Sequence, residues 1–237
     1  MKNLIQALAR SFLGLFHPKI LLLMFVPPIL ALIFWGTVAF FAWPQLMAIA
    51  AWMISWAPDF VHSATGAIAV ILAIGMVLPL ALVSVLVFTS VLAMPVIVPH
   101  VSSKYFPELV KNNSGAFSAS LKNALWTSAK YLVMWFLTMP LWFVPGLNIA
   151  VPLVLNAYLN YKLFIYDALG NHASPLEIQE VIQSKRAEFY VLGLVTAVLV
   201  IVPVVFLIAP FYSGLAFTHM GLSELKDFRN EKPKVKL

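Results

Sequence analysis

Four long stretches of the chain contain no Asp, Glu, Lys or Arg, and they dominate its hydrophobic pattern. They lie between Lys19 and Asp59, between Asp59 and Lys104, between Lys130 and Lys162, and between Glu188 and Glu224. A helix needs about 20 apolar residues to cross the hydrocarbon core of a bilayer, because each residue adds only ~1.5 Å. All four stretches exceed this length. The pattern therefore predicts an all-α integral membrane protein.

The first two apolar segments, residues 20–43 and 64–98, predict two long transmembrane helices. Pro27 and Pro28 predict a kink near the start of the first, because proline interrupts the hydrogen-bond ladder of a helix. The second segment is longer than one perpendicular crossing, which indicates a tilt or a bend. Residues 44–63 carry tryptophans and suit a helix in the interface on the far side of the membrane.

Two later apolar blocks, residues 131–161 and 189–222, predict helical hairpins. Pro145 and Gly146 break the first block near its middle, and each half then has about 15 residues, which is short for a full crossing. The second block contains two prolines, Pro203 and Pro210. Basic residues flank both blocks on both sides, so we expect hemi-penetrating hairpins that enter and leave by one face. Six complete crossings obey the same charge pattern and are the alternative.

The less apolar segments of this single membrane domain, residues 1–237, predict surface elements. They comprise an amphipathic interfacial helix at 1–18, cytoplasmic surface helices at 102–130, a surface helix at 174–188 and a basic cytoplasmic tail at 223–237. In the first of these, Leu4, Leu8 and Phe12 fall on one face, as in helices that lie in the membrane interface. Ser174, followed three residues later by Glu177, is a capping box that signals the start of a helix.

The composition supports a lipid environment and narrows the classes of function. Hydrophobic residues make up 62% of the chain and charged residues only 10%, whereas soluble domains are about half apolar and a quarter charged. The 15 Lys and Arg, against 9 Asp and Glu, are scattered at the edges of apolar segments, which argues against nucleic acid as a partner. The chain has no cysteine, so disulfides and thiolate metal sites are excluded.

The distribution of basic residues predicts the orientation in the membrane. Lys and Arg concentrate in the N-terminal region, in residues 102–130 and in the C-terminal tail, and residues 44–63 contain none. Because cytoplasmic loops are enriched in these residues, we expect a multi-pass protein with both termini in the cytoplasm. The expected location is a bacterial inner membrane, with the lipid bilayer as its partner.

Short motifs in a fixed order along this hydrophobic plan point to a known family. They are His17-Pro18 before the first span, Ala93-Met94-Pro95 at the end of the second, Phe143-Val144-Pro145-Gly146 at the first hairpin tip, Tyr166-Asp167 after it, and Pro203 with Pro210 in the last block. In these marks the chain resembles the etoposide-induced-protein superfamily, which contains the bacterial sulfate permeases called CysZ. The resemblance runs from about Leu8 to Leu225. It implies two long transmembrane helices, two hemi-penetrating helix pairs, a homo-oligomer and, for the CysZ branch, sulfate uptake.

One motif of these sulfate permeases is missing. The permeases that this chain resembles carry a Gly-Ile/Leu-Arg-Arg run directly after the early proline, and the run binds the anion. The matching positions here are Lys19, Ile20, Leu21 and Leu22. Leucine has none of the hydrogen-bond donors that arginine offers to an oxyanion. Lys19 is therefore the candidate anion contact at this place, although a snorkelling interfacial anchor is the ordinary role of such a lysine.

Polar side chains in the third apolar block are the other candidate pathway residues. Asn148, Asn156 and Asn160 share one helix face, because their separations are multiples of four. They either line a pathway for a small inorganic anion or hydrogen-bond to neighbouring helices and hold the bundle together. Asp167 follows Lys162 closely, which favours a structural ion pair or a helix-end contact over proton transfer.

The sequence predicts no catalytic, cofactor or metal site. The five histidines are dispersed, and none stands at metal-ligand spacing from another. Nucleophile motifs, phosphate loops and dinucleotide fingerprints are also missing. The sequence therefore favours a non-enzyme. It is either a CysZ-like transporter or channel for sulfate or another small anion, or a non-transporting membrane scaffold that keeps the family fold.

Overall fold

The structure is a computed structural model that describes residues 2–56, 65–110, 116–202 and 205–231. Helices and turns make up these ranges, and no strand occurs within them. Three helical stretches, Ile20–Ile54, Thr65–Tyr105 and Leu147–Gly170, are long and apolar enough to cross a membrane. The prediction of an all-α protein of the membrane type is confirmed.

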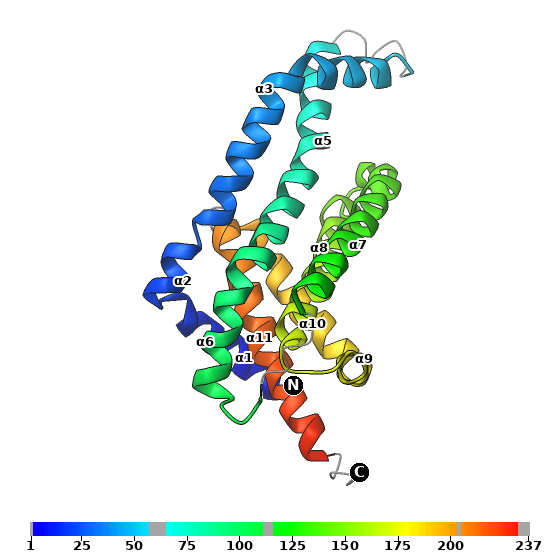
Figure 1. The fold of residues 1–237 in the computed structure, drawn as a ribbon. Coiled ribbons are helices and arrows are strands. Elements are labelled where there is room, and N and C mark those ends of the chain that lie inside the picture. The colour runs from blue at the N-terminus through cyan, green and yellow to red at the C-terminus, as the bar shows by residue number, and fades with distance from the viewer. Residues whose placement is uncertain (1, 57–64, 111–115, 203–204, 232–237) are drawn as a thin grey trace.

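Two helices, α3 (Val26–Ile54) and α5 (Thr65–Phe88), pair along their length and extend well beyond the other helices (Figure 1). A shorter helix, α2 (Pro18–Leu23), precedes α3, so the chain breaks just before Pro27 and Pro28 as predicted. Trp35 of α3 donates a hydrogen bond from Nε1 to the Ser84 hydroxyl of α5 at 3.0 Å, which ties the pair together.

The second long helix changes its winding where it enters the body of the molecule. α5 passes into a π-helical turn, η1 (Thr89–Ala93), and then into α6 (Met94–Tyr105), with Pro95 in the first turn of α6. A π-turn shifts the register of the side chains that follow it and is often found at functional sites. Ser90 of this turn faces the protein interior and is buried.

The hairpin predicted at 131–161 is present, and its arms are longer than the apolar block. Its elements are α7 (Ala116–Thr138), the 3-10 turn η2 (Met139–Phe143) and α8 (Leu147–Gly170). Gly146 at the tip has φ +87°, a left-handed conformation that glycine adopts without a steric penalty. The arms are longer because residues 116–130, expected as surface helix, form the first half of α7, and residues 162–170 continue α8.

A second hairpin follows at the expected place. Its elements are α9 (Pro175–Ser184), α10 (Arg186–Val198), the 3-10 turn η3 (Leu199–Ile201) and α11 (Val205–Glu231). Residues 223–231, expected as part of a tail, continue α11 as packed helix, with Leu225 fully buried. Pro210 lies inside α11, and Pro203 lies outside the described residues. Both hairpins end short of the far end of α3 and α5 (Figure 1).

The N-terminal helix α1 (Lys2–Leu15) packs along α11 and leaves an apolar face open. Leu4 and Ala7 are buried, whereas Phe12 and Leu13 are exposed. The Tyr212 hydroxyl of α11 donates to a backbone carbonyl of α1 at 3.1 Å. The predicted amphipathic face is therefore divided, because α11 covers Leu4 while Phe12 faces outward.

The capping box at the start of α9 is confirmed and also holds α11. The Glu177 backbone N–H donates to the Ser174 hydroxyl, and the Ser174 N–H donates to the Glu177 carboxylate. Arg229 of α11 donates to the same carboxylate at 2.9 Å. Partial burial raises the pKa of Glu177, but the hydrogen bonds from Arg229 and Ser174 outweigh it and hold that pKa below its ordinary value.

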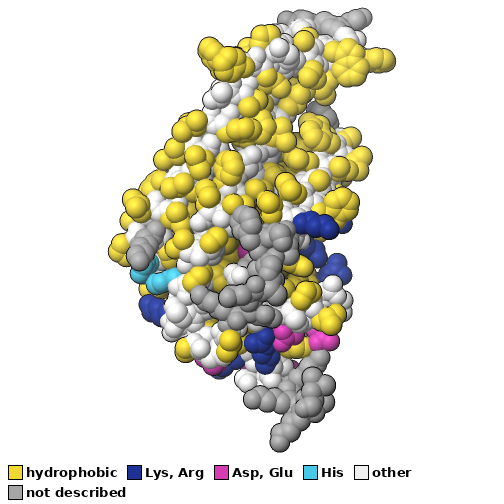
Figure 2. Space-filling view, in the orientation of Figure 1, with side chains coloured by type: hydrophobic (Ala, Val, Ile, Leu, Met, Phe, Trp, Pro, Cys, Tyr) yellow, Lys and Arg dark blue, Asp and Glu magenta, His cyan; other side chains and the backbone are white. Residues whose placement is uncertain are grey.

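The surface divides into an apolar part and a charged end. Figure 2 shows hydrophobic side chains over the long pair and the hairpins, and Lys, Arg, Asp and Glu near the end that holds both termini. Large apolar side chains on the long pair are open to the surroundings: Phe40 is 78% exposed and Leu32 is 76% exposed. Exposed apolar area on this scale requires a lipid or protein environment.

Candidate functional site

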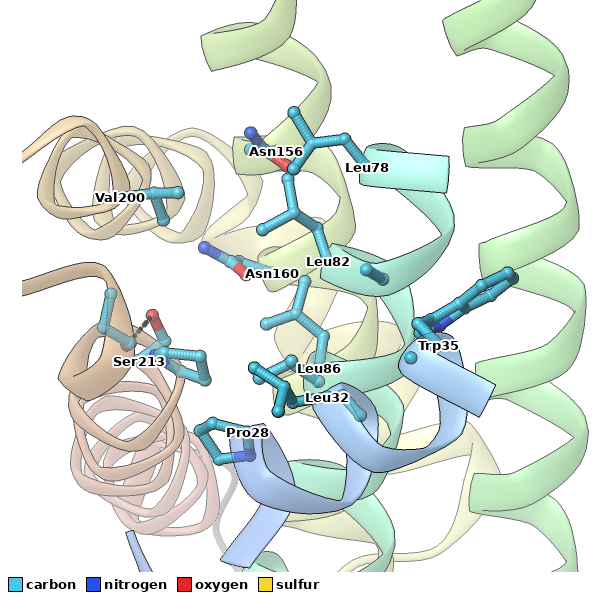
Figure 3. A pocket seen from close by; sticks show the side chains of 16 residues that line it. Pro28, Leu32, Trp35, Leu78, Leu82, Leu86, Asn156, Asn160, Val200 and Ser213 are labelled. Atoms are coloured by element: carbon cyan, nitrogen blue, oxygen red, sulfur yellow. Dashed lines mark hydrogen bonds between the residues drawn. The ribbon is translucent and has the colours of Figure 1, made fainter. Parts of the chain in front are cut away.

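Two of the three predicted asparagines, Asn156 and Asn160, line a cavity between the long pair and the second hairpin. The cavity has a volume of about 450 Å³, and its walls come from α3, α5, α8, η3 and α11. Figure 3 shows Asn156 and Asn160 of α8 beside leucines of α5, with Val200 and Ser213 across from Asn160. Most of the wall is apolar, so the amides of α8 are the main polar groups that a solute there would meet.

A smaller cavity continues this one toward the hairpin tip. It has a volume of about 190 Å³ and is lined by Asn148, Asn156 and Val200, among others. Asn156 and Val200 line both cavities. The three asparagines therefore follow one face of α8 from the tip, where Asn148 is exposed, to Asn160, which is only 2% exposed.

Asn156, which is partly buried, and Asn160, which is buried, each also bond to a neighbouring helix. The Tyr131 hydroxyl of α7 donates to Asn156 Oδ1 at 3.1 Å, and Asn160 Nδ2 donates to the Thr196 hydroxyl of α10 at 3.4 Å. Asn160 Oδ1 is buried and has no hydrogen-bond partner among the described residues. The same side chains therefore join helices and line the cavities.

Close packing of α10 on α8 holds Asn160 against Thr196. A Cβ atom at Gly193 would lie 2.6 Å from the backbone oxygen of Ala157, well inside van der Waals contact. Only glycine fits there, so α10 can approach α8 closely enough for the Asn160–Thr196 hydrogen bond one turn further along. This contact could not be predicted from the sequence, because Gly193 is one glycine in a uniformly apolar segment.

Asp167 lies in a polar pocket at the π-turn rather than beside Lys162. The hydroxyl of Ser90 donates to its carboxylate, and Ser120 of α7 donates to it as well. Asp167 is 7% exposed and lines a cavity of about 240 Å³ together with Asn171. The expected ion pair with Lys162 is not formed, because successive helical turns carry the two side chains to different faces of α8. Ser90 and Ser120 were missed by sequence analysis, since both are distant from Asp167 in the chain.

The remaining candidate, Lys19, lies in the first turn of α2, but its side chain lies outside what the structure describes. No group of three or more His, Cys, Asp or Glu side chains that could hold a metal ion occurs among the described residues. The asparagine-lined cavities are thus the best-defined candidate site in the described part of the chain.

Comparison with known families adds a decisive observation. Residues 7–210 match the family described as sulfate transporter CysZ/etoposide-induced protein 2.4. The chain belongs to this family. The match covers both long helices, the α7–α8 hairpin and the start of α11, so the CysZ/etoposide-induced family accounts for almost the whole fold. The comparisons with curated proteins and with solved structures gave no match.

Membership of the CysZ/etoposide-induced family changes how the geometry is interpreted. The resemblance inferred from short motifs is confirmed, and the chain is a membrane protein of the CysZ-like family. The departure from the sulfate-permease motif at Lys19–Leu22 remains a property of this chain. The family match therefore leaves the substrate to be argued from the cavity itself.

Proposed function

We propose that this protein is a CysZ-like channel or transporter for sulfate or another small anion, with the asparagine face of α8 as its path. The observation that carries the proposal is the pair of adjoining cavities that share Asn156 and run from the hairpin tip to Asn160. Polar groups at membrane depth are tolerated where they line a cavity, and they often mark the path of a solute.

The amides are suited to a small anion because they carry N–H donors without a fixed charge. Asn156 accepts the Tyr131 hydrogen bond with Oδ1, and no described residue accepts from its Nδ2. Its amide N–H groups therefore remain for a ligand in the cavity. Weak neutral donors bind an oxyanion less tightly than arginines do, which favours passage over retention.

The direct test is sulfate flux into proteoliposomes. We expect radiolabelled sulfate to enter vesicles that contain the purified protein faster than empty vesicles of the same lipid. Asn160→Leu should lower the rate several-fold, because it fills the cavity and removes the buried amide. Gln45→Leu, a similar change at an exposed position of α3, is the matched control and should keep the wild-type rate. Equal flux into protein-containing and empty vesicles contradicts the proposal.

The scaffold alternative is motivated by the missing arginines at Lys19–Leu22. It predicts no flux and normal growth of a deletion strain on sulfate as sole sulfur source. A growth defect on sulfate that the wild-type chain restores would instead support transport.

We further infer that α3 and α5 cross a bacterial inner membrane, while both hairpins enter and leave it from the cytoplasmic side, where both termini lie. The inference is supported by the shorter reach of the hairpins and by the charged end at the termini (Figures 1 and 2).

Labelling of introduced cysteines tests this topology. Because the chain has no cysteine, a single introduced cysteine is its only thiol, and its labelling reports the side of the membrane on which it lies. Ser55→Cys should react with an impermeant thiol reagent added to intact cells, and Ser184→Cys should react only after lysis. Labelling of Asn148→Cys in intact cells would show that the first hairpin crosses completely.

A further inference from the structure

A further cavity, on the opposite side of α8 from the asparagine face, carries a concentration of positive charge. It has a volume of about 500 Å³ and lies between α7, α8, α9 and the start of α10. Lys162 of α8 and Arg186 of α10 line it. Lys130 of α7 is close enough, with Arg186, to act electrostatically on Lys162. The cavity is thus lined by two cations from two helices, and a third cation, Lys130, lies nearby.

Among the described residues that line the cavity there is no Asp or Glu. Lys162, Arg186 and Lys130 form no ion pair there, whereas Glu177 and Glu188 pair with other basic residues. The ammonium groups lie instead over aromatic rings, with Lys162 Nζ 4.9 Å from the Tyr161 ring and Lys130 Nζ 4.9 Å from the Trp126 ring. Like charges held together repel one another, and a bound anion removes that cost.

Neutral donors complete the lining. Tyr161 is only 2% exposed, its hydroxyl has no partner among the described residues, and it borders the cavity. Gln179 and Gln183 of α9, one helical turn apart, line the same cavity. A phenol, two glutamine amides, a lysine and an arginine supply hydrogen-bond donors in several directions, and the guanidinium fork matches two oxygens of a tetrahedral anion.

The position of the cavity points to the level of lipid headgroups. Trp126 and Leu125 are exposed on α7 directly before Lys130, and tryptophan beside lysine is typical of the membrane–water interface. Figure 2 shows Lys and Arg side chains along the lower border of the apolar surface. Basic pockets between helices at this level recognise phosphate headgroups.

We propose that the cavity between α7, α8, α9 and α10 is a binding site for a tetrahedral oxyanion group, held by Lys162 and Arg186. The group is either the phosphate of an anionic lipid headgroup or a free sulfate or phosphate ion. This site is separate from the asparagine-lined cavities, and its existence does not depend on transport.

Binding measurements on the purified full chain test the site with two probes. One is phosphatidylglycerol, counted as lipid retained by the protein in native mass spectrometry, with phosphatidylcholine as the neutral reference. The other is sulfate, titrated against the protein in lipid-free detergent by microscale thermophoresis. Lys162→Gln/Arg186→Gln should weaken binding of the preferred probe at least tenfold, since two charge-assisted hydrogen bonds are lost. Lys2→Gln/Lys104→Gln removes the same net charge elsewhere and should change affinity less than twofold.

The outcomes separate the two sources of the oxyanion. Selective retention of phosphatidylglycerol that is lost in Lys162→Gln/Arg186→Gln assigns a lipid site, and charge-dependent sulfate binding assigns a free-anion site. Lys162→Arg/Arg186→Lys, which keeps both charges at the same positions, should retain binding and so show that the loss in Lys162→Gln/Arg186→Gln comes from the missing charge. Equal affinity of the wild type and Lys162→Gln/Arg186→Gln for both probes overturns the proposal. Because neither probe measures flux, a failed transport assay leaves these results unaffected.

Discussion

Gly193→Ala is expected to destabilise the protein by ~2–3 kcal/mol, although alanine is the better helix former. The added methyl group would lie 2.6 Å from the backbone oxygen of Ala157. A backbone oxygen cannot swing away like the end of a side chain, so α10 must move off α8. Separation of these helices also lengthens the Asn160–Thr196 hydrogen bond. In a thermal scan of purified protein, followed by tryptophan fluorescence, we expect a midpoint roughly 5–10 °C lower.

The control for this prediction is the same substitution at an open position. A Cβ atom at Gly75 of α5 meets nothing within 4 Å. Gly75→Ala should therefore leave the midpoint unchanged or raise it slightly, because alanine has the higher helix propensity. If both alanine variants unfolded at the same temperature, α10 would not pack on α8 as described.

Removal of the Ser90 hydroxyl is expected to have an effect of similar size. Ser90→Ala takes one of two hydroxyl donors from the buried carboxylate of Asp167. A hydrogen bond to a charged group in the interior contributes about 1.5–3 kcal/mol, so we expect a loss of ~2–3 kcal/mol. Ser103→Ala on α6, whose hydroxyl is exposed and bonds to its own helix, should change stability little.

A double-mutant cycle identifies the partner. Asp167→Asn removes the charge from the hydrogen-bond acceptor, so Ser90→Ala should destabilise the Asp167→Asn protein less than it destabilises the wild type. We expect a coupling free energy of about 1 kcal/mol or more between Ser90→Ala and Asp167→Asn, measured from the unfolding of the four proteins. Strict additivity of the two changes would show that the π-turn and α8 are held together by other contacts.

The sequence alone predicted the elements that depend on local pattern. The long apolar segments, the break at Pro27 and Pro28, the turn at Gly146 and the capping box at Ser174 are all present in the structure. Each follows from hydrophobic length, from the fixed backbone angle of proline, or from a side chain that bonds to a nearby N–H group. These are properties of residues close together in the chain.

Features that depend on contacts between distant segments were not predicted. The partner of Asp167 is Ser90 on a π-turn, and uniform apolar sequence gives no sign of such a turn. The lengths of the hairpin arms were underestimated. The polar residues at 116–130 predicted a surface helix, but they form the first half of α7, where Asn123 donates a hydrogen bond to the Lys162 carbonyl of α8. The clustering of Lys130, Lys162 and Arg186 likewise requires three helices in their folded positions.

The most direct test of the path along α8 uses a thiol reagent during sulfate flux. Asn156→Cys places one cysteine in the Cys-free chain at the position shared by both cavities. We predict that a small anionic methanethiosulfonate reagent blocks most of the sulfate flux into proteoliposomes of this variant. The same reagent should leave the wild type unaffected, because the wild type has no thiol. Undiminished flux through Asn156→Cys in the presence of the reagent would contradict a path along the asparagine face.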